Sequence, residues 1–401
     1  MGYRMAPSPQ PLRFRSLAFP GRLGLCAFLV LWAASVHAQN WTFRPVFSLG
    51  VGYDSNAVYI SGASSPGDYF GGLGVRAPLS GRLSKKTTIS ANYAINGEWY
   101  QDLETLNTFP SSQNAALAWS YADGEVTTFS LGGRYSMSRR PEEVFPDSGL
   151  AYLRGKTESL GGYTNFGRRL SQRTRLTLGY NYERPFFEPT EGFERQAQGH
   201  TGTASLGRDL KPGSTLSVRY KYQLYERTDL PRDESHVVGL AYTHAFGRST
   251  TFSLFGGARF ASGEVRPDAA ASLGHAWRSS QITASYAKNR NYIPTTGTFS
   301  DTDNAGLTYS FSQRRFRLTL FAGYSRNRFE DEFFGLNRDL DSYRGSLDTV
   351  YMLKHWLGLG ATYQYNWQRS GDTDFDNRSR HLVQVGLVVA PWSGKEAQGL
   401  R

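Results

Sequence analysis

Apolar and polar residues alternate along almost the whole chain after its first 40 residues. Leu176, Leu178, Tyr180 and Tyr182 stand at every second position, with polar residues or glycine between them. The segment 357–367 repeats the pattern with leucine, alanine, tyrosine and tryptophan. A period of two is typical of a β-strand with one apolar face. No stretch sustains the 3.6-residue period of an amphipathic helix, so the pattern predicts an all-β protein.

The alternation is broken by two kinds of connection, and the two kinds take turns along the chain. The short breaks are residues 81–86, 122–125, 168–173, 208–214, 247–250, 278–281, 312–315 and 354–356. The long breaks are residues 57–67, 102–113, 139–149, 184–194, 226–234, 263–268, 289–301, 327–340 and 370–377. These connections separate about 18 strands. Short turns alternating with long loops are typical of a transmembrane antiparallel up-and-down β-barrel.

Aromatic residues cluster near the ends of the expected strands. Those beside the short breaks or near the C-terminus are Trp119, Tyr121, Phe246, Trp277, Phe311 and Trp392. Those beside the long breaks are Tyr53, Trp99, Tyr182, Tyr222, Tyr324 and Trp367. Two such rows are expected where a barrel crosses the two interfaces of a bilayer. The alternative is a soluble β-sandwich, which would hide its aromatic residues in a core.

Composition supports a barrel rather than a bundle of membrane helices. The 401 residues include 43 Gly, 25 Phe, 24 Tyr and 8 Trp. The mean hydropathy is −0.47, which is too polar for a chain of transmembrane helices. The aromatic content also argues against intrinsic disorder, which is poor in such residues.

The first 38 residues have the features of a secretory signal. They contain arginines and no acidic residue, then an apolar run over 23–34 and small residues at Val36 and Ala38. The run is too short for a membrane span, although an interfacial helix is an alternative. We therefore predict a signal peptide over 1–38, one barrel domain over 39–392 without a plug, and a short polar tail over 393–401. Cleavage would remove Cys26, the single cysteine, and with it any disulfide or thiolate chemistry.

If the apolar positions face lipid, the alternate positions face the lumen. The basic residues expected there are Arg44, Arg76, Arg134, Arg175, Arg219, Lys221, Arg259, Arg317 and Arg344. The acids expected on the same strands are Glu98, Glu183 and Asp348. A barrel of 16–18 strands leaves an aqueous channel, and a basic lumen concentrates anions. The alternative is that these charges only solvate the pore and pair across it.

No catalytic, cofactor or metal site is expected. The histidines lack metal-ligand spacing, and the run 372–376 departs from a calcium loop, with Asn377 at the glycine position. The long connections are rich in acids and the short ones in Lys and Arg, which we interpret as solvated loops. We expect contact with outer-membrane lipid and lipopolysaccharide, and no nucleic-acid partner.

The first expected strand carries a family resemblance. Its end, Tyr53-Asp54-Ser55-Asn56, matches Tyr-Asp-x-Asn and resembles the opening of a family of outer-membrane β-barrel porins from bacterial exopolysaccharide export loci. The segment 67–79 is also similar, and the layout of the whole barrel agrees. The chain differs in ending on Gly399-Leu400-Arg401 rather than on an aromatic residue. The resemblance implies an exit pore for a secreted polysaccharide that works with a separate periplasmic export protein. The excess of basic over acidic residues expected in the lumen predicts that this polysaccharide is anionic.

Two classes of function follow from these observations. The first is an outer-membrane pore for exopolysaccharide. The second is a general or small-solute porin, or a structural outer-membrane protein without a dedicated cargo. A gene neighbourhood with glycosyltransferases and a chain-length kinase would favour the first.

The signal and the alternating strands predict where the protein is found. The mature protein should fractionate with outer membranes and migrate faster on gels before boiling than after it, because closed barrels resist detergent at room temperature. Recovery as a soluble periplasmic protein would contradict the barrel prediction.

Overall fold

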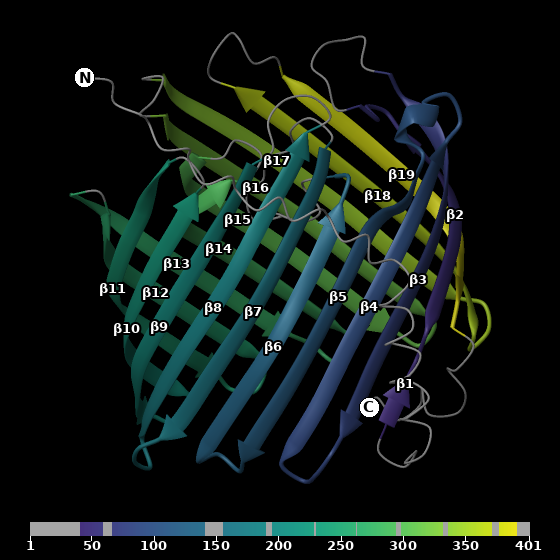
Figure 1. Cartoon of the computed structure of the whole chain (residues 1–401). Helices are drawn as coiled ribbons and strands as arrows, with labels where there is room; N and C mark the ends of the chain where they lie inside the picture. The colour runs from purple at the N-terminus through teal and green to yellow at the C-terminus, as the bar shows by residue number, and fades with distance from the viewer. Residues whose placement is uncertain are drawn as a thin grey trace, which may run out of the picture. The chain divides into compact units, whose positions relative to one another are not determined.

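The computed structural model describes residues 41–58, 66–140, 155–189, 195–227, 230–261, 263–293, 298–331, 336–370 and 377–390. Within the unit 42–401, β2 to β19 form one closed ring of 18 antiparallel strands, as the sequence predicts. Each strand pairs with its neighbours in the chain, and β19 pairs with β2 to close the ring (Figure 1). The short strand β1, Trp41–Phe43, lies outside the ring and pairs with β3.

The strands are long for a barrel that only crosses a bilayer. They are β2 Val46–Asp54, β3 Asp68–Arg82, β4 Thr87–Tyr100, β5 Thr108–Asp123, β6 Thr127–Ser138, β7 Gly155–Arg169, β8 Thr174–Pro189, β9 Arg195–Lys211, β10 Ser214–Arg227, β11 Leu230–Phe246, β12 Thr250–Ala261, β13 Glu264–Ala276, β14 Ser280–Ile293, β15 Thr298–Gln313, β16 Phe316–Asp331, β17 Leu336–Met352, β18 Leu357–Ser370 and β19 Arg378–Val389. A tilted strand needs about 9–11 residues to span the hydrocarbon core, so the longest strands, at 17 residues, extend beyond it.

The alternation in the sequence becomes an apolar outer face. Leu49, Val51, Leu178, Val218 and Leu359 are all among the exposed large hydrophobic residues, between 43% and 64% exposed. Polar residues and glycine occupy the positions between them, on the inward face. A soluble protein would bury such side chains, whereas a barrel in lipid turns them outward.

Aromatic rings form rows at both ends of the outer face. Near the long connections, Tyr324, Tyr343 and Trp367 stand side by side on three strands, with ring centroids 5.0 and 5.1 Å apart. Near the short turns, the rings of Trp119 and Phe129 meet edge to face at 5.6 Å. These rows lie where an amphipathic ring is best accommodated, at the interface between hydrocarbon and water.

The seam between the last and first strands of the ring is tight. Gly50 of β2 pairs with Gly386 of β19, and both face inward. A Cβ atom on Gly50 would lie 2.7 Å from the backbone oxygen of Val385. Glycine therefore allows the two backbones to approach closely where the barrel closes.

All eight short turns lie where the sequence predicts them, but the long connections differ from the prediction. Residues 226–234 were expected to form a long loop, yet β10 continues to Arg227 and β11 begins at Leu230. The predicted loops 184–194, 263–268, 289–301 and 327–340 are also shortened by ordered strand. These hairpins continue past the apolar band, where lipid no longer requires one face of each strand to be apolar. The hydrogen-bond ladder persists there while the apolar alternation that reveals a strand disappears.

Several sequence predictions fall outside the described residues. They concern the signal peptide over 1–38, Trp392, the run 372–376 and the tail over 393–401. Among the described residues, no helix is long and apolar enough to cross a membrane.

The orientation of β8 predicts unequal costs for charge on its two faces. Leu178→Arg should lower the free energy of unfolding in lipid vesicles by up to about 2–4 kcal/mol, since it places a cation against hydrocarbon. Thr177→Arg, one residue away and facing the lumen, should cost far less. Equal losses in denaturant titrations would show that the two faces are misassigned.

Candidate functional site

The strand register places the predicted basic residues on the inward face of the ring. Neighbouring positions in the ladder point to the same face, and the eight that lie on strands are all of inward parity: Arg76, Arg134, Arg175, Arg219, Lys221, Arg259, Arg317 and Arg344. Arg44 lies between β1 and β2, and its backbone N–H donates to the carbonyl oxygen of Pro78 at 3.2 Å. The inward face is the surface on which a channel function depends.

Inward cations in the half of the lumen nearer the long connections are paired with acids. Arg134 lies 3.7 Å from Glu183, and Lys221 lies 4.0 Å from Asp268. Arg259 forms ion pairs with Asp268 at 3.9 Å and with Asp301, and it is only 1% exposed. The sequence did not indicate that Asp268 and Asp301 would take part. Arg259 points inward but does not present its charge to the channel.

The cover over Arg259 comes from the β14–β15 hairpin. Arg290 of β14 forms an ion pair with Asp233 of β11 at 2.7 Å. The rings of Tyr292 and Phe299 lie 5.8 and 5.3 Å from the ring of Tyr225 on β10. These contacts reach past β12 and β13 to strands that are not neighbours in the sheet. The hairpin end is therefore packed against the inner wall, which narrows the lumen on that side.

A local feature of the sheet explains this inward packing. β13 pairs with β14 only from Ala269 to Ala276, whereas β14 and β15 pair along their full length up to Ile293 and Thr298. The outer part of the β14–β15 hairpin has no β13 ladder beside it. It can therefore bend away from the cylinder. Its side chains then form ion pairs and ring contacts with β10, β11 and β12 on the inner wall.

The half of the lumen nearer the short turns has a different charge pattern. Arg76, Arg175, Arg219 and Arg317 are exposed there, and none has an acidic partner within ion-pair distance among the described residues. Arg76 donates from Nε to Asn92 Oδ1 at 3.5 Å, and Arg175 donates from Nη2 to the carbonyl oxygen of Glu125 at 3.3 Å. Neutral acceptors leave the positive charge uncompensated.

The three inward acids named from the sequence are each engaged locally. Glu183 accepts a hydrogen bond from the Tyr225 hydroxyl at 2.6 Å, and Asp348 accepts one from Thr362 at 2.9 Å. Glu98 accepts from Arg140 Nη2 at 2.8 Å. None of the three forms an ion pair with the four arginines of the short-turn half.

The Tyr-Asp-x-Asn segment lies at the seam of the ring. Asp54 is fully buried and accepts two hydrogen bonds from Arg380 of β19, from Nε at 2.8 Å and from Nη2 at 2.5 Å. Asn56 donates from Nδ2 to the carbonyl oxygen of Ser379 at 3.2 Å. Tyr53 faces outward, with its ring 5.0 Å from that of Tyr69. The motif therefore ties the first strand of the ring to the last.

A second arginine extends this cluster into the lumen wall. Arg140 Nη2 donates to the Tyr100 hydroxyl at 2.9 Å and lies 3.8 Å from Asp54. Sequence reasoning missed Arg140 and Arg380 because both adjoin breaks in the alternating pattern. Their inward parity was the only available signal, and burial beside Asp54 could not be inferred from it.

Three histidines repeat one arrangement on the outer face. In each case a hydrogen bond joins the imidazole Nδ1 to a tyrosine hydroxyl on the preceding strand. The distances are 2.8 Å for His200, 2.8 Å for His236 and 2.9 Å for His381. A second tyrosine ring lies beside each imidazole. These histidines belong to the outer aromatic row and do not face the lumen. Among the described residues, no three His, Cys, Asp or Glu side chains are grouped to hold a metal ion.

Comparison with solved structures finds outer-membrane proteins of low similarity. OccAB4 of Acinetobacter baumannii is 13% identical with a TM-score of 0.44, covering 88% of this chain and 99% of the other. OccK3 (OpdO) of Pseudomonas aeruginosa is 13% identical with a TM-score of 0.45, covering 87% and 96%. The FrpB iron transporter from Neisseria meningitidis is 10% identical with a TM-score of 0.45, covering 88% and 81%. These likenesses are weak, and the barrel is established by its own strand register.

Sequence comparison adds no family assignment. No protein-family model matches the chain. No curated protein matches it either.

The Asp54–Arg380 ion pair at the seam is buried, so removing one partner should strongly reduce the stability of the barrel. Asp54→Ala should lower the free energy of unfolding by about 3–5 kcal/mol, because it removes the carboxylate that accepts two hydrogen bonds from the buried Arg380 guanidinium. The change can be measured as a lower temperature for the loss of the fast-migrating folded band. Asp348→Ala is the control, since its exposed carboxylate contacts Thr362, and its band should melt close to that of the wild type. Equal melting of the two variants would contradict the seam role.

Proposed function

We propose that this protein is an outer-membrane pore through which an anionic exopolysaccharide leaves the cell. The observation that carries the proposal is the set of exposed inward arginines, Arg76, Arg175, Arg219 and Arg317, without acidic partners among the described residues. The resemblance of the Tyr53–Asn56 segment to porins of exopolysaccharide export loci supplies the cargo class.

The charge distribution suits conduction of a polyanion. Low-dielectric walls focus the field of inward cations, which raises the local concentration of anions. Guanidinium groups can pair bidentately with carboxylate or phosphate. The hold must remain weak and spread over several sites, because a conduit that binds its cargo tightly cannot release it.

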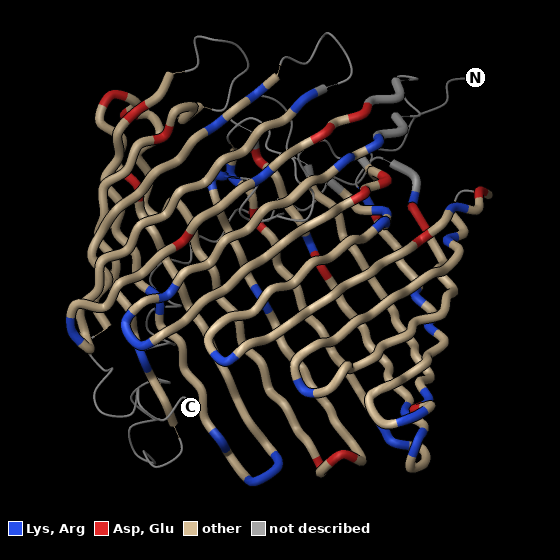
Figure 2. The backbone as a smooth tube through the Cα atoms, turned by 180° about the vertical axis from the view of Figure 1, so that it is seen from behind, with Lys and Arg blue, Asp and Glu red and all other residues tan. Residues whose placement is uncertain are grey.

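The direction of the charge pattern also supports export. Lys and Arg occupy most of the short turns (Figure 2), including Lys85, Lys86, Arg248, Arg314 and Arg315. In bacterial outer-membrane barrels the short turns face the periplasm. A cargo arriving from the periplasm would first meet this positive end and then pass to the charge-paired half.

The pore would act on its cargo without chemistry or a cofactor. The driving force would come from synthesis of the polymer, with a separate periplasmic export protein delivering it. The surrounding partners would be outer-membrane lipid and lipopolysaccharide, which contact the apolar face and the aromatic rows.

A second candidate is a general or small-solute porin. The observation that favours it is the inward packing of the β14–β15 hairpin, which narrows the lumen beside Arg259 and Tyr225. A small anion would pass such a constriction more readily than a hydrated polymer chain.

Deletion of the gene separates the two candidates. Loss of surface polysaccharide, with the biosynthetic enzymes still present, is expected for an export pore and should be restored by the wild-type gene. Normal surface polysaccharide in the deletion strain would leave the porin function as the better account.

Charge reversal tests the role of the lumen arginines. Replacing Arg175, Arg219 and Arg317 together by Glu should slow polysaccharide export and convert an anion-preferring pore to a cation-preferring one in planar bilayers. The matched control carries the same charge change at Arg208, Arg248 and Arg278, which lie on the outer face or in short turns. A wild-type pore that prefers cations would contradict the argument from lumen charge.

A further inference from the structure

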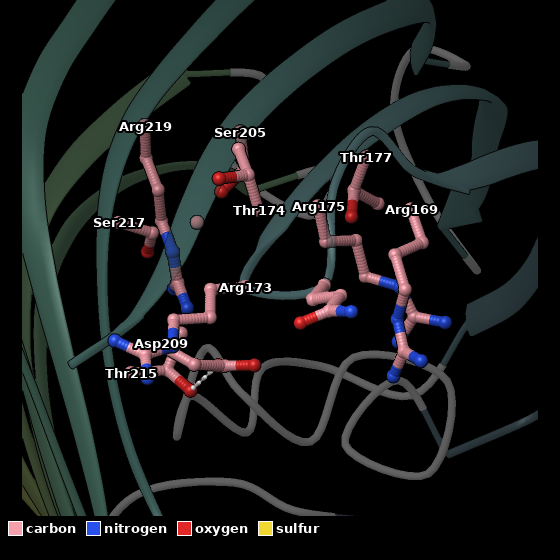
Figure 3. A pocket seen from close by; sticks show the side chains of 12 residues that line it. Arg169, Arg173, Thr174, Arg175, Thr177, Ser205, Asp209, Thr215, Ser217 and Arg219 are labelled. Carbon is pink, nitrogen blue, oxygen red and sulfur yellow. Dashed lines mark hydrogen bonds between the residues drawn. The ribbon is translucent and has the colours of Figure 1, made fainter. Parts of the chain in front are cut away.

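Four arginines gather around one hollow at the short-turn end of β7 to β10. Arg169, Arg173, Arg175 and Arg219 line a space of about 250 Å³, together with Ser and Thr hydroxyls (Figure 3). Arg169 and Arg173 were not among the lumen residues expected from the sequence. They come from the end of β7 and from the following turn.

The register explains why these side chains meet. Arg169 pairs with Arg175, Arg175 with Gly207, and Gly207 with Ser217, which forms one row across four strands. In the next row, Ser205 pairs with Arg219. Arg175 and Arg219 stand two strands apart and two residues apart along the strand, which places their backbones about 12 Å from each other at the usual spacings.

Gly207 leaves the centre of the row without a side chain. A Cβ atom built there would contact Thr215 at 3.5 Å and Ser217 at 3.6 Å, which is ordinary van der Waals separation. The position can therefore accept a larger residue, and in the native chain it remains open between the arginines of β8 and β10.

The hollow contains little negative charge. Asp209 is the single acid among its described lining residues, and it accepts a hydrogen bond from Thr215 at 2.6 Å. Arg169 is ion-paired with Glu125 of the β5–β6 turn. Arg173, Arg175 and Arg219 have no acidic partner among the described residues, so an external anion would meet unneutralised guanidinium groups.

We infer that this hollow is a discrete binding site for a carboxylated glycan chain, engaged from the periplasmic side. Arg175 and Arg219 would each donate to a different acidic group along the chain, with the Ser and Thr hydroxyls donating to its sugar hydroxyls. The inference rests on the proposed export role and adds where the cargo is first held and what chemistry holds it. Because the described lining residues of this hollow all come from β7 to β10 and their turns, the cargo would be held on one side of the lumen.

The separation of the cations favours a polymer over a single small anion. A chain with several linked carboxylates can engage Arg175 and Arg219 at the same time, and linkage raises the effective concentration of the second carboxylate once the first is bound. A single phosphate ion has no such second group to offer. Each contact between a carboxylate and an arginine is solvated and weak. The affinity comes from several such contacts made by one glycan chain. Such binding is reversible and sensitive to salt.

Current block in planar bilayers tests the site directly. The full-length mature chain is inserted, and oligogalacturonate is added to each side in turn, with maltodextrin of equal length and inorganic phosphate as comparison probes. Oligogalacturonate should block the current from the short-turn side, and the block should weaken as salt rises. Maltodextrin and phosphate should block at least about tenfold more weakly.

A pair of substitutions at one position isolates the charge. Gly207→Asp places a carboxylate between the arginines and should weaken the block by oligogalacturonate at least about tenfold. Gly207→Asn has nearly the same shape without the charge and should retain the block. Folding of both variants is checked by the fast-migrating gel band, and Arg219→Gln provides an independent test if Gly207→Asp does not fold.

The results distinguish this inference from the export role. Equal block by phosphate or maltodextrin, equal block from both sides, or unchanged block in Gly207→Asp would overturn the binding site, while deletion could still abolish surface polysaccharide. One-sided block that Gly207→Asp removes would support the site even if the deletion strain kept its surface polysaccharide.

Discussion

Closure of the sheet is the constraint on which the rest of this structure depends. An open edge facing lipid would leave backbone N–H and C=O groups without partners, at a cost of several kcal/mol for each group. The pairing of β19 with β2 removes that edge. The opposed Gly50 and Gly386 and the buried pair of Asp54 with Arg380 concentrate close packing and charge at this seam. The Tyr-Asp-x-Asn segment thus has a structural explanation that is independent of any cargo.

Once the ring is closed, one face of every strand is reserved for lipid, and function is confined to the other. The inward face is divided along the barrel axis. In the half nearer the long connections, Arg134, Lys221 and Arg259 are balanced by carboxylates, and the β14–β15 hairpin covers part of the wall. In the half nearer the short turns, arginines remain exposed and uncompensated. The two ends of the lumen therefore differ in uncompensated positive charge, and this difference is not apparent from the net charge of the chain.

Polar side chains are also paired in the aromatic row on the outer face. Tyr-His hydrogen bonds recur on three strand pairs within the aromatic row, at Tyr180–His200, Tyr220–His236 and Tyr363–His381. Each places a polar tip beside an apolar ring, which suits the boundary between hydrocarbon and headgroups. Because the same Tyr-His pair recurs on three strand pairs, we infer that the boundary between hydrocarbon and headgroups favours this combination of side chains.

The sequence by itself determined the class of fold, the number of strands in the ring and the face to which residues point in the part of each strand that crosses lipid. These follow from a period of two, which is local and survives in every strand that crosses lipid. It did not determine where strands end beyond the apolar band, because residues 226–234 and 289–301 lose their alternation while keeping their ladder. Only the tertiary structure decided which inward charges are neutralised. Arg259 and Arg219 have the same local pattern, yet one lies beneath Asp301 from a distant strand and the other faces the open hollow. The difference depends on contacts between residues far apart in the chain, and local pattern carries no information about them.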